Sequence, residues 1–342
     1  MDPVIAGATP RLSTADAVAI GAELFGVQAS AARDLGSERD RTFRLDDVAI
    51  LKVSNAAEDP DVLDMEAAAA FHVTAVDPGL RVALPREAVT GGHRARWGEH
   101  WVRLYDVLPG RSRIDATALS DAALGAWGET TARLGVALRG FTHPRAVRTM
   151  PWDIQHALDA RAMLDCVGEG RDVVARTLDA FEARVVPVWP RLRAQVAHTD
   201  LTVDNTLTDE HGLITGIIDF GDMSHTALIT DLASVLDSVC GGREDPFRVA
   251  RLVVDGYQRR VALEEAELEA LGVCWAARCA ITVAISCWRV AQGLEEAAWA
   301  ERYNGVALAT LRAMEAAGWD AVARLFGAEG ARRPDPGLAA RR

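Results

Sequence analysis

Two short stretches of the sequence combine side chains that could move a proton beside a bound metal ion. The first, residues 198–205, reads H-T-D-L-T-V-D-N and places the carboxylate of Asp200 five residues before the amide of Asn205. The second begins fourteen residues after Asn205 with Asp219-Phe220-Gly221. A positioned carboxylate can accept the proton of a hydroxyl, and oxygen ligands are the kind that Mg²⁺ takes. These residues are therefore the first candidates for a site.

The two stretches follow patterns known from phosphoryl-transfer chemistry. H-x-D-L-x-x-x-N is the catalytic-loop pattern of protein kinases, and D-F-G is their metal-binding triplet. Either one alone occurs by chance in many chains. Here both occur in this order, separated by one short expected hairpin whose turn is D-E-H-G at 209–212. The combination indicates transfer of a phosphoryl group from a nucleotide to a hydroxyl.

The sequence contains a single lysine, Lys52, among 37 basic residues. Arginine can replace lysine at a solvated position but not where a compact ammonium group must enter a tight site. Lys52 lies in the apolar stretch A-I-L-K-V at 49–53, which is similar to the V-A-I-K strand of kinases with one position inserted. Glu66 follows fourteen residues later on an expected helix, and we predict that it pairs with Lys52. The alternative is a lysine that extends to solvent from an edge strand.

A small mixed lobe of strands and helices is expected to carry Lys52. The S-T-A-D start at 13–16 and Gly26 delimit a first helix. The short stretches that follow, and the turns between them, favour antiparallel strands. The expected elements are a helix at 13–25, strands at 27–35, 42–45 and 48–53, a helix from 60, and strands at 81–84 and 100–108. Pro109-Gly110 closes this lobe.

The remainder is rich in alanine and leucine at helical spacing. Helices are expected at 117–139, 153–168, 171–186, 228–240, 246–260, 264–291 and 295–327, with one strand-rich island at 196–218. We therefore predict an α+β, protein-kinase-like fold of two lobes. An antiparallel β-rich, nucleotide-binding N-lobe spans 1–108, and a mostly helical C-lobe at 109–330 holds the catalytic loop and the substrate site. Residues 331–342 are expected to form a frayed tail.

The composition excludes several other classes of protein. Of the 342 residues, 49% are apolar, which rules out a disordered chain. The formal net charge of −12 argues against nucleic-acid binding and suits a cationic ligand. The five cysteines show no metal-binding spacing, no signal peptide is visible, and Arg278 and Arg289 interrupt the most apolar window, 271–290. We expect a cytoplasmic protein that acts on a small molecule without a membrane partner, and its oligomeric state stays open.

Six stretches together resemble one family of enzymes. They are S-E-R-D-R-T-F at 37–43, I-L-K-V-S-N at 50–55, F-T-H-P to P-W-D at 141–153, H-T-D with Asn205, I-D-F-G-D-M at 218–223 and T-D-L-A at 230–233. From Ser13 to Gly318, the chain resembles the aminoglycoside phosphotransferase and choline kinase-like superfamily, and within it the hydroxylysine kinase branch. The resemblance implies a small-molecule kinase with Mg²⁺ as cofactor and ATP or GTP as co-substrate.

The resemblance also implies roles by position. It makes Asp200 the catalytic base, Asn205 and Asp219 the Mg²⁺ ligands, Lys52 the phosphate-binding lysine paired with Glu66, and Leu104 to Leu108, with Tyr105, the hinge whose backbone meets the purine. The chain departs from the family pattern at two places. The phosphate-covering loop lacks G-x-G-x-x-G, so Ser37 and backbone N–H groups there would contact phosphate. Thr199 stands before Asp200, where the superfamily often has glycine or asparagine.

Candidates for substrate binding leave alternatives open. Asp222 follows D-F-G by one residue and could meet a substrate ammonium group or metal-bound water. Arg278 and Arg289 lie about three turns apart on one expected helix, and they could form internal salt bridges or clamp a substrate carboxylate. Trp152 is a further pocket candidate. A hydroxylysine-like amino alcohol or an aminoglycoside fits this set, while choline, homoserine and sugar amines stay open.

Two other functions are considered. A nucleotide-binding pseudokinase would normally have lost Lys52, Asp200, Asn205 or Asp219, and all four are present. A protein kinase would carry an A-P-E-type segment after D-F-G, whereas the sequence from Met223 runs directly into an expected helix. The small-molecule kinase is therefore the prediction.

Overall fold

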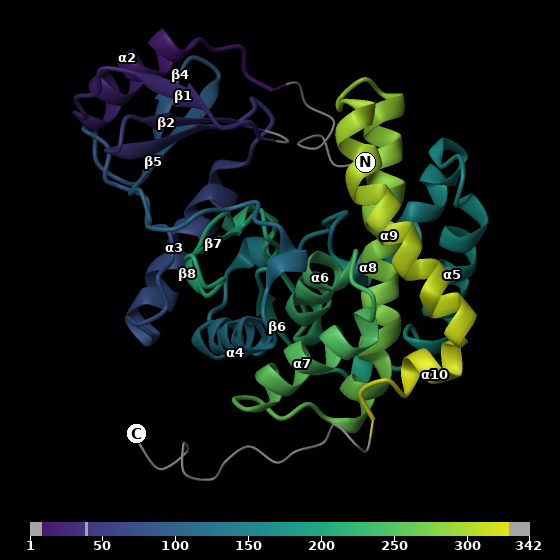
Figure 1. The fold of residues 1–342 in the computed structure, drawn as a ribbon. Helices are drawn as coiled ribbons and strands as arrows, with labels where there is room; N and C mark the ends of the chain where they lie inside the picture. The colour runs from purple at the N-terminus through teal and green to yellow at the C-terminus, as the bar shows by residue number, and fades with distance from the viewer. Residues whose placement is uncertain (1–8, 38–39, 328–342) are drawn as a thin grey trace.

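The computed structural model describes residues 9–37 and 40–327, which form a small lobe of strands and a larger helical lobe (Figure 1). The tail expected at 331–342 lies outside the described residues. The prediction of an α+β fold with a β-rich N-terminal lobe and a mostly helical C-terminal lobe is confirmed.

The small lobe is built on one antiparallel sheet of five strands in the order β1-β2-β3-β5-β4. The strands are β1 (Ala32–Asp34), β2 (Arg41–Leu45), β3 (Ala49–Val53), β4 (Ala95–Trp97) and β5 (His100–Tyr105). Along β3 the buried residues alternate, so Ala49, Leu51 and Val53 enter the core of the lobe. Because successive side chains of a strand point to opposite faces, Lys52 faces the other side of the sheet.

Helix α2 (Thr14–Phe25) covers the core face of this sheet, and the sequence sets both of its ends. Ser13 and Asp16 form a reciprocal capping box at its start. Gly26 ends the helix in the left-handed conformation, with φ of +65°. The expected helix at 13–25 is therefore confirmed almost to the residue.

Two expected strands of the small lobe are shorter than predicted. The strand expected at 27–35 is paired only over β1, and the one expected at 81–84 makes a single bridge, from Val82 to Ile217 of the larger lobe. Pro85 follows directly and makes one further bridge, to Tyr105 of β5, but it has no N–H to donate to a ladder. The 81–84 segment thus joins the lobes instead of extending the sheet.

Helix α3 (Pro60–Val76) lies between the two lobes. Asp59 caps its first turn and Pro60 occupies the first helical position, as the sequence indicates. Its buried apolar side chains, among them Met65, Ala69 and Val73, pack into the core of the larger lobe. Glu66 is buried on the same helix and is directed by it toward the small-lobe sheet, where it contacts Arg103 of β5.

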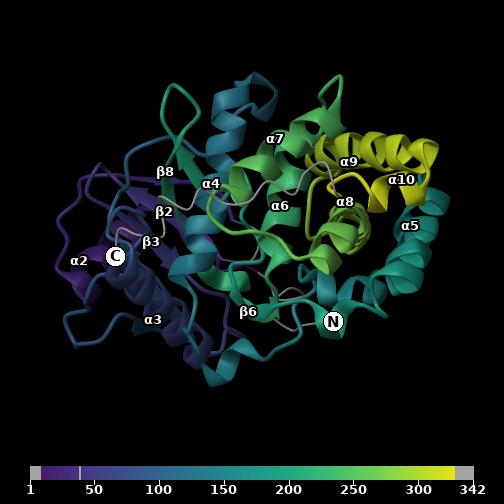
Figure 2. The same cartoon turned by 90° about the horizontal axis from the view of Figure 1, so that it is seen from below.

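The larger lobe is assembled around α8 (Glu265–Ala291), whose neighbours surround it in Figures 1 and 2. The other helices are α4 (Asp121–Ala137), η3 (Ile154–Cys166), α5 (Arg171–Arg184), α6 (Ile229–Cys240), α7 (Pro246–Gln258), α9 (Ala297–Ala317) and α10 (Trp319–Ala323). The expected helix at 153–168 is 3₁₀ with a kink at His156. The one expected at 295–327 breaks at Gly318, where φ is +85°.

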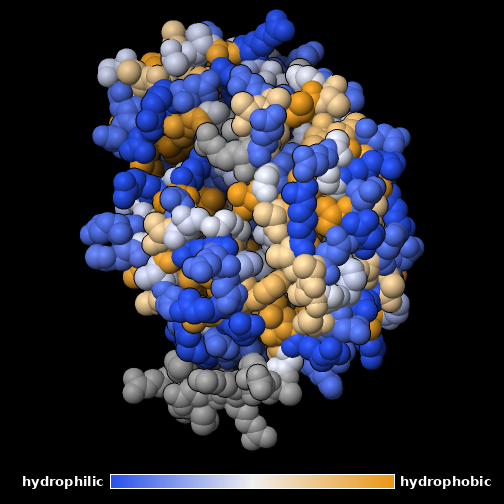
Figure 3. All heavy atoms as spheres, turned by 45° about the vertical axis from the view of Figure 1, so that its right-hand side comes forward, coloured by the Kyte–Doolittle hydropathy of each residue, from blue (hydrophilic) through white to orange (hydrophobic). Residues whose placement is uncertain are grey.

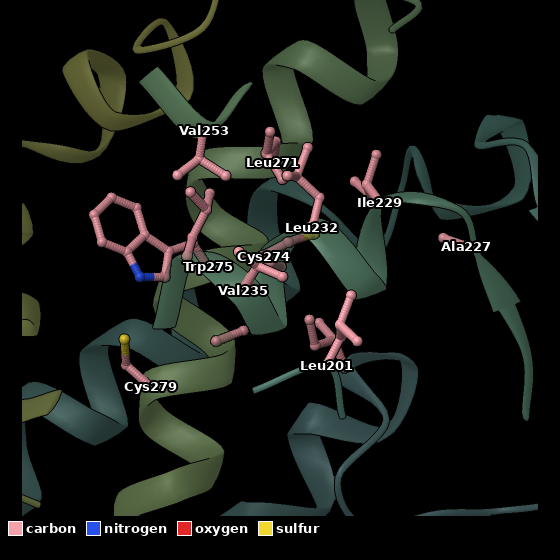
Figure 4. Packing of buried hydrophobic residues seen from close by; sticks show 14 of the residues in the cluster. Leu201, Ala227, Ile229, Leu232, Val235, Val253, Leu271, Cys274, Trp275 and Cys279 are labelled. Atoms are coloured by element: carbon pink, nitrogen blue, oxygen red, sulfur yellow. The ribbon is translucent and has the colours of Figure 1, made fainter. Parts of the chain in front are cut away.

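By length and composition α8 could cross a membrane, but 89% of its most apolar window is buried inside the protein. Figure 4 shows Cys274, Trp275 and Cys279 of α8 close to apolar side chains of α6 such as Val235. Burial raises the pKa of the Cys274 thiol well above its usual range, so it serves here as a small apolar side chain. Helix α8 is therefore the core helix of this lobe.

Candidate active site

Four short strands bring the two chemistry-bearing stretches together. Strand β6 (Ala194–Ala197) pairs with β9 (Ser224–Ala227), and β7 (Thr206–Thr208) pairs with β8 (Ile214–Ile217). One hairpin is therefore nested within the other. The catalytic loop, 198–205, runs from β6 to β7, and the metal loop, 218–223, returns from β8 to β9. Both loops cross the same gap and lie side by side, joined by the Ile218 amide donating to the Asn205 carbonyl at 3.0 Å.

The catalytic loop is held from below by helix α6. The carboxylate of Asp231 accepts backbone N–H groups from His198 and Thr199, at 3.3 and 2.6 Å. Ser234 donates its hydroxyl to the Thr199 carbonyl at 2.6 Å. Leu201, the residue after Asp200, is buried at the edge of the apolar cluster drawn in Figure 4. The loop is thus anchored on both sides of Asp200, and Asp231 ties it to helix α6.

Thr199 has a backbone conformation that a β-branched residue rarely adopts, with φ of +65°. Its hydroxyl donates to the Asp222 carbonyl at 2.7 Å, which joins the catalytic loop to the metal loop. Asp219 is also left-handed, with φ of +61°. Non-glycine residues held in this region by their surroundings cluster at functional sites. Each of the two loops therefore contains one such residue.

Asp200 sits in a buried network that fixes both of its carboxylate oxygens. Arg278 of α8 donates to Oδ1 at 2.6 Å, and the amide nitrogen of Asn205 donates to Oδ2 at 2.6 Å. Burial raises the pKa of Asp200 above its usual range, Arg278 opposes that shift, and the nearby carboxylates of Asp222 and Asp204 add to it. A raised pKa on a positioned carboxylate is typical of a general base.

Arg278 is almost completely buried and bonds to the protein on several sides. It also donates to the Trp152 carbonyl at 2.9 Å, lies over the Trp152 ring at 5.0 Å, and approaches Asp237 of α6 at 3.8 Å. Arg289, eleven residues farther along α8, pairs with Glu295 at 3.1 Å. At 1.5 Å per residue, the two arginines are about 16 Å apart along the helix. Both form ion pairs within the protein, and they are too far apart to clamp one small carboxylate together.

The metal loop is held in place by Arg148, which the sequence analysis did not single out. Its guanidinium donates to the carbonyls of Gly221 and Met223, the latter at 2.9 Å. Asp222 lies between these two residues, is buried, and is close enough to Asp200 to raise its pKa. Arg148 belongs to the 141–153 stretch, so the signal was the resemblance of that stretch, while the role needed the structure.

Lys52 reaches across from β3 to the metal loop. Its ammonium group lies 2.8 Å from Oδ1 of Asp219 and 3.4 Å from Oδ2 of Asp40. Burial alone would lower the pKa of Lys52, but these two carboxylates outweigh it and hold the pKa above its ordinary value. The lysine is charged, partly buried, and directed into the space between the lobes, as its survival in an arginine-rich chain suggested.

The predicted pair between Lys52 and Glu66 is wrong in this structure. Glu66 is paired with Arg103 of β5, which also lies 3.2 Å from Ser54 and 3.5 Å from Asp40. The reason lies in the register of the sheet, because Arg103 is the cross-strand neighbour of Lys52. The longer, forked side chain of Arg103 pairs with Glu66, so Glu66 is not available to Lys52. Spacing along the sequence cannot reveal such a neighbour.

The remaining expected nucleotide contacts lie around the same space. Ser37 is in the connection between β1 and β2, next to residues 38–39 outside the description. Tyr105 ends β5, and Leu108 follows it and packs against Gly216 of β8. Within the expected hinge, the Leu104 carbonyl already accepts from the Arg86 amide at 2.6 Å. The role of Leu104 to Leu108 as the purine-binding hinge stays a prediction.

The donor set suits a hard cation such as Mg²⁺. Among the described residues no three His, Cys, Asp or Glu side chains form a metal cluster. Mg²⁺ typically takes only one or two protein carboxylates together with substrate phosphates and water. Asp219 supplies a carboxylate, and Asn205 points its amide nitrogen at Asp200, which turns its oxygen the other way. These two oxygen donors on adjacent loops fit the role that the sequence predicts for them.

Comparison with known proteins agrees with this geometry. The chain belongs to the phosphotransferase enzyme family, whose profile matches residues 31–271. It is 25% identical to hydroxylysine kinase of Mus musculus over 301 residues, which cover 78% of this chain and 79% of that protein. The chain is accordingly a small-molecule kinase, and the resemblance to the hydroxylysine kinase branch is confirmed. The relatives give no support to the pseudokinase alternative.

Two solved structures share the fold at low sequence identity. An amicoumacin kinase in complex with AMP-PNP and Ca²⁺ has a TM-score of 0.66 and 18% identity, covering 84% of this chain and 91% of that one. A microcompartment-associated aminopropanol kinase has a TM-score of 0.65 and 17% identity, covering 88% and 94%. The kinase-like two-lobed fold is therefore shared with enzymes that phosphorylate small molecules.

Proposed function

We propose that this enzyme transfers the γ-phosphate of ATP or GTP, bound with Mg²⁺, to a hydroxyl group of a small molecule that also carries an amine. A hydroxylysine-like amino alcohol or an aminoglycoside is the expected acceptor. The observation that carries the proposal is the acidic surrounding of Asp200, where Asp222 and Asp204 act on its carboxylate and Asp237 lies 3.8 Å from its partner Arg278. A cationic acceptor would offset that charge.

The chemistry assigned to the chain's own residues is simple. Asp200 accepts the proton of the acceptor hydroxyl while the oxygen of that hydroxyl bonds to the γ-phosphorus. The bond between the γ-phosphorus and the oxygen that bridges it to the β-phosphate breaks, which releases a nucleoside diphosphate. Asn205 and Arg278 hold the Asp200 carboxylate in one orientation during this step. Lys52 binds the inner phosphates, and Asp219 with Asn205 would hold Mg²⁺. The metal, when bound, neutralises charge on the phosphates.

The class of acceptor rests on the relatives as well as on the charge. Hydroxylysine kinase and an aminopropanol kinase both act on compounds that carry an amine and a hydroxyl. Asp222 is the residue we assign to the ammonium group, since it is buried one residue beyond Gly221 and acts electrostatically on Asp200. Trp152 would line the same side of the site through its contact with Arg278. Such metabolites and nucleotides are found in the cytoplasm, where we place the enzyme.

The test is a phosphoryl-transfer assay with paired acceptors. Hydroxylysine, homoserine, 1-amino-2-propanol, choline and kanamycin are each measured with ATP and with GTP, in Mg²⁺ and in chelator. Each amino alcohol is matched by the same alcohol without its amine. We expect transfer that needs Mg²⁺ and a kcat/KM at least tenfold higher for the amine-bearing member of a pair. Equal rates for the two members would overturn the acceptor assignment, and no transfer to any acceptor would overturn the proposed function.

A further inference from the structure

Five charges, three of them buried, form one continuous series of ion pairs that runs from helix α3 and the small-lobe sheet to the metal loop of the larger lobe. Glu66 pairs with Arg103, Arg103 lies 3.5 Å from Asp40, Asp40 lies 3.4 Å from Lys52, and Lys52 lies 2.8 Å from Asp219. Arg103, Asp40 and Glu66 are only 2%, 5% and 7% exposed. This series of ion pairs starts at Glu66 on α3 and ends at Asp219 on the metal loop. Two residues, Arg103 and Asp40, stand between Glu66 and Lys52 in the series.

Arg103 makes a direct pair between Glu66 and Lys52 unfavourable. A guanidinium group stays protonated in proteins, and a buried cation needs a carboxylate partner. If Glu66 turned to Lys52, Arg103 would keep only the more distant Asp40 and the hydroxyl of Ser54. Arg103 also lies directly across the ladder from Lys52, so each cation disfavours the other and each needs its own carboxylate. Glu66 therefore stays paired with Arg103 and is not available to Lys52.

Asp40 has the geometry of a separate anchor for Lys52. Its Oδ2 faces both Lys52 and Arg103, and its Oδ1 is buried without a hydrogen-bond partner in the described part of the chain. Asp40 also lies three residues after Ser37, at the start of β2, in the segment expected to cover phosphates. When Asp219 is drawn to a metal ion, Asp40 remains as the carboxylate beside the lysine.

We propose that Asp40, and not Glu66, is the positioning residue that holds Lys52 for the phosphates of a nucleoside triphosphate, while Arg103 occupies Glu66. This inference rests on the proposed nucleotide-dependent phosphoryl transfer and assigns a new residue to it. The consequence is that nucleotide binding depends on a carboxylate in the phosphate-covering segment instead of one on helix α3.

The test compares Asp40→Asn with Glu66→Gln, two substitutions that each remove one charge from a similarly buried carboxylate. Asp40→Asn leaves Arg103 its direct partner Glu66, whereas Glu66→Gln leaves it only Asp40, at 3.5 Å, and therefore needs the double variant Glu66→Gln, Arg103→Met as a second measurement. Affinity for the nonhydrolysable analogue AMP-PNP is measured by calorimetry without acceptor, in Mg²⁺ and in chelator. We expect Asp40→Asn to weaken binding about tenfold or more in both conditions and Glu66→Gln to stay within about threefold of wild type. KM for the acceptor should not change in either variant.

Several outcomes would overturn the inference. One is a tenfold loss for Glu66→Gln with little effect of Asp40→Asn, which would restore the direct lysine–glutamate pair. Another is a loss for Asp40→Asn only in Mg²⁺, which would make Asp40 a metal ligand. If Glu66→Gln folds poorly, the double variant Glu66→Gln, Arg103→Met removes both charges, and we expect its affinity to stay within about threefold; a tenfold loss there also overturns the inference.

The controls separate this inference from the proposed function. Asp64 lies on the same helix as Glu66 and forms an exposed ion pair with Arg94. The control variant Asp64→Asn breaks that pair and should leave the affinity for AMP-PNP unchanged. Wild-type protein that binds neither AMP-PNP nor its guanosine counterpart GMP-PNP would overturn the proposed function and the inference together. Wild-type protein that binds one of them, with the two variants in the reverse order, would overturn the inference alone.

Discussion

The two lobes each bury a cluster of charges, and the clusters differ in balance. The small-lobe cluster sets two cations, Lys52 and Arg103, against three carboxylates, Asp40, Glu66 and Asp219. The catalytic cluster sets Arg278 against Asp200 and Asp237, with Asp222 and Asp204 acting on Asp200 from nearby. A second cation, the more exposed Arg113, pairs with Asp204 at 3.1 Å. Positive and negative charges nearly balance in the small-lobe cluster, whereas the catalytic cluster has an excess of negative charge.

The difference in charge balance matches the ligand that we propose for each cluster. Phosphates bring negative charge, so a site for them must offer a cation whose own carboxylate can be drawn elsewhere, as Asp219 would be by a metal ion. An amine-bearing acceptor brings positive charge, so a site for it is best left with unbalanced carboxylates. The surface away from these clusters is ordinary: Figure 3 shows hydrophilic side chains interspersed with smaller hydrophobic areas on one face.

The largest effect is expected in the catalytic cluster, from Asp200→Asn. The amide keeps the shape of the carboxylate but cannot take the proton of the acceptor, so kcat should fall by at least ~10²-fold, the usual range for a positioned base. Affinity for AMP-PNP should be nearly unchanged, because the small-lobe cluster is intact. Steady-state kinetics and calorimetry measure the two quantities. A variant that turns over like wild type would remove Asp200 from its role.

The second effect tests the small-lobe cluster through Lys52→Arg. The substitution keeps the charge but adds a planar, forked head beside Arg103, where Asp40 and Asp219 hold a compact ammonium group. We expect kcat/KM for the nucleotide to fall on the order of 10²-fold, about 2.7 kcal/mol, with a melting temperature close to that of wild type. Activity within about threefold of wild type would show that the site accepts any cation.

A third prediction concerns pH and Arg278, the arginine that donates to the Asp200 carboxylate. Arg278 lowers the pKa of Asp200, against burial and the neighbouring carboxylates, which raise it. Removing it in Arg278→Met should raise that pKa further. Because the ionised form is the base, the acid limb of the kcat–pH profile should move to higher pH, by about one unit or more for the loss of an adjacent opposite charge.

The matched control for Arg278→Met is Arg289→Met. Both arginines are on α8 and each is 3% exposed, but Arg289 pairs with Glu295 and not with Asp200. Its profile should keep the wild-type acid limb, although its stability should fall in a similar way. An acid limb of Arg278→Met that stays in place or moves to lower pH would contradict the assignment of Arg278 as the partner that keeps Asp200 ionised.

The sequence was sufficient where a role depends on local pattern. Neighbouring residues set the caps of α2 and the alternation of β3, which turns Lys52 away from the core of the small lobe. They also set the positions of Asp200 and Asp219 on their two loops. Asn205 falls beside Asp200 because both lie on one short loop between β6 and β7. These features are set by short-range sterics and hydrogen bonds, which spacing along a chain describes well.

The sequence was insufficient where a role depends on register or on distant contacts. Arg103 takes Glu66 because β3 and β5 pair in one register and not in another. Arg278 lies 78 residues from Asp200, and its partner is decided by how α8 packs against the catalytic loop. Arg148 likewise acts through two backbone carbonyls of the metal loop. Long-range ion pairs and hydrogen bonds of this kind are consequences of tertiary packing.

The smallest expected effect concerns Thr199, which links the two loops while its backbone is left-handed. Thr199→Val keeps the strain of a β-branched residue and leaves the buried Asp222 carbonyl without its donor, so the free energy of unfolding should fall by about 1–2 kcal/mol. Thr199→Gly loses the same hydrogen bond but relieves strain of about 1–3 kcal/mol, against about 0.4–1 kcal/mol of added chain entropy in the unfolded state. Its stability should therefore stay within about 1 kcal/mol of wild type. Urea unfolding of the two variants measures the difference. If glycine and valine destabilised the protein equally, the strain at Thr199 would be no larger than the entropy cost of glycine, about 0.4–1 kcal/mol, and the prediction of larger strain would be wrong.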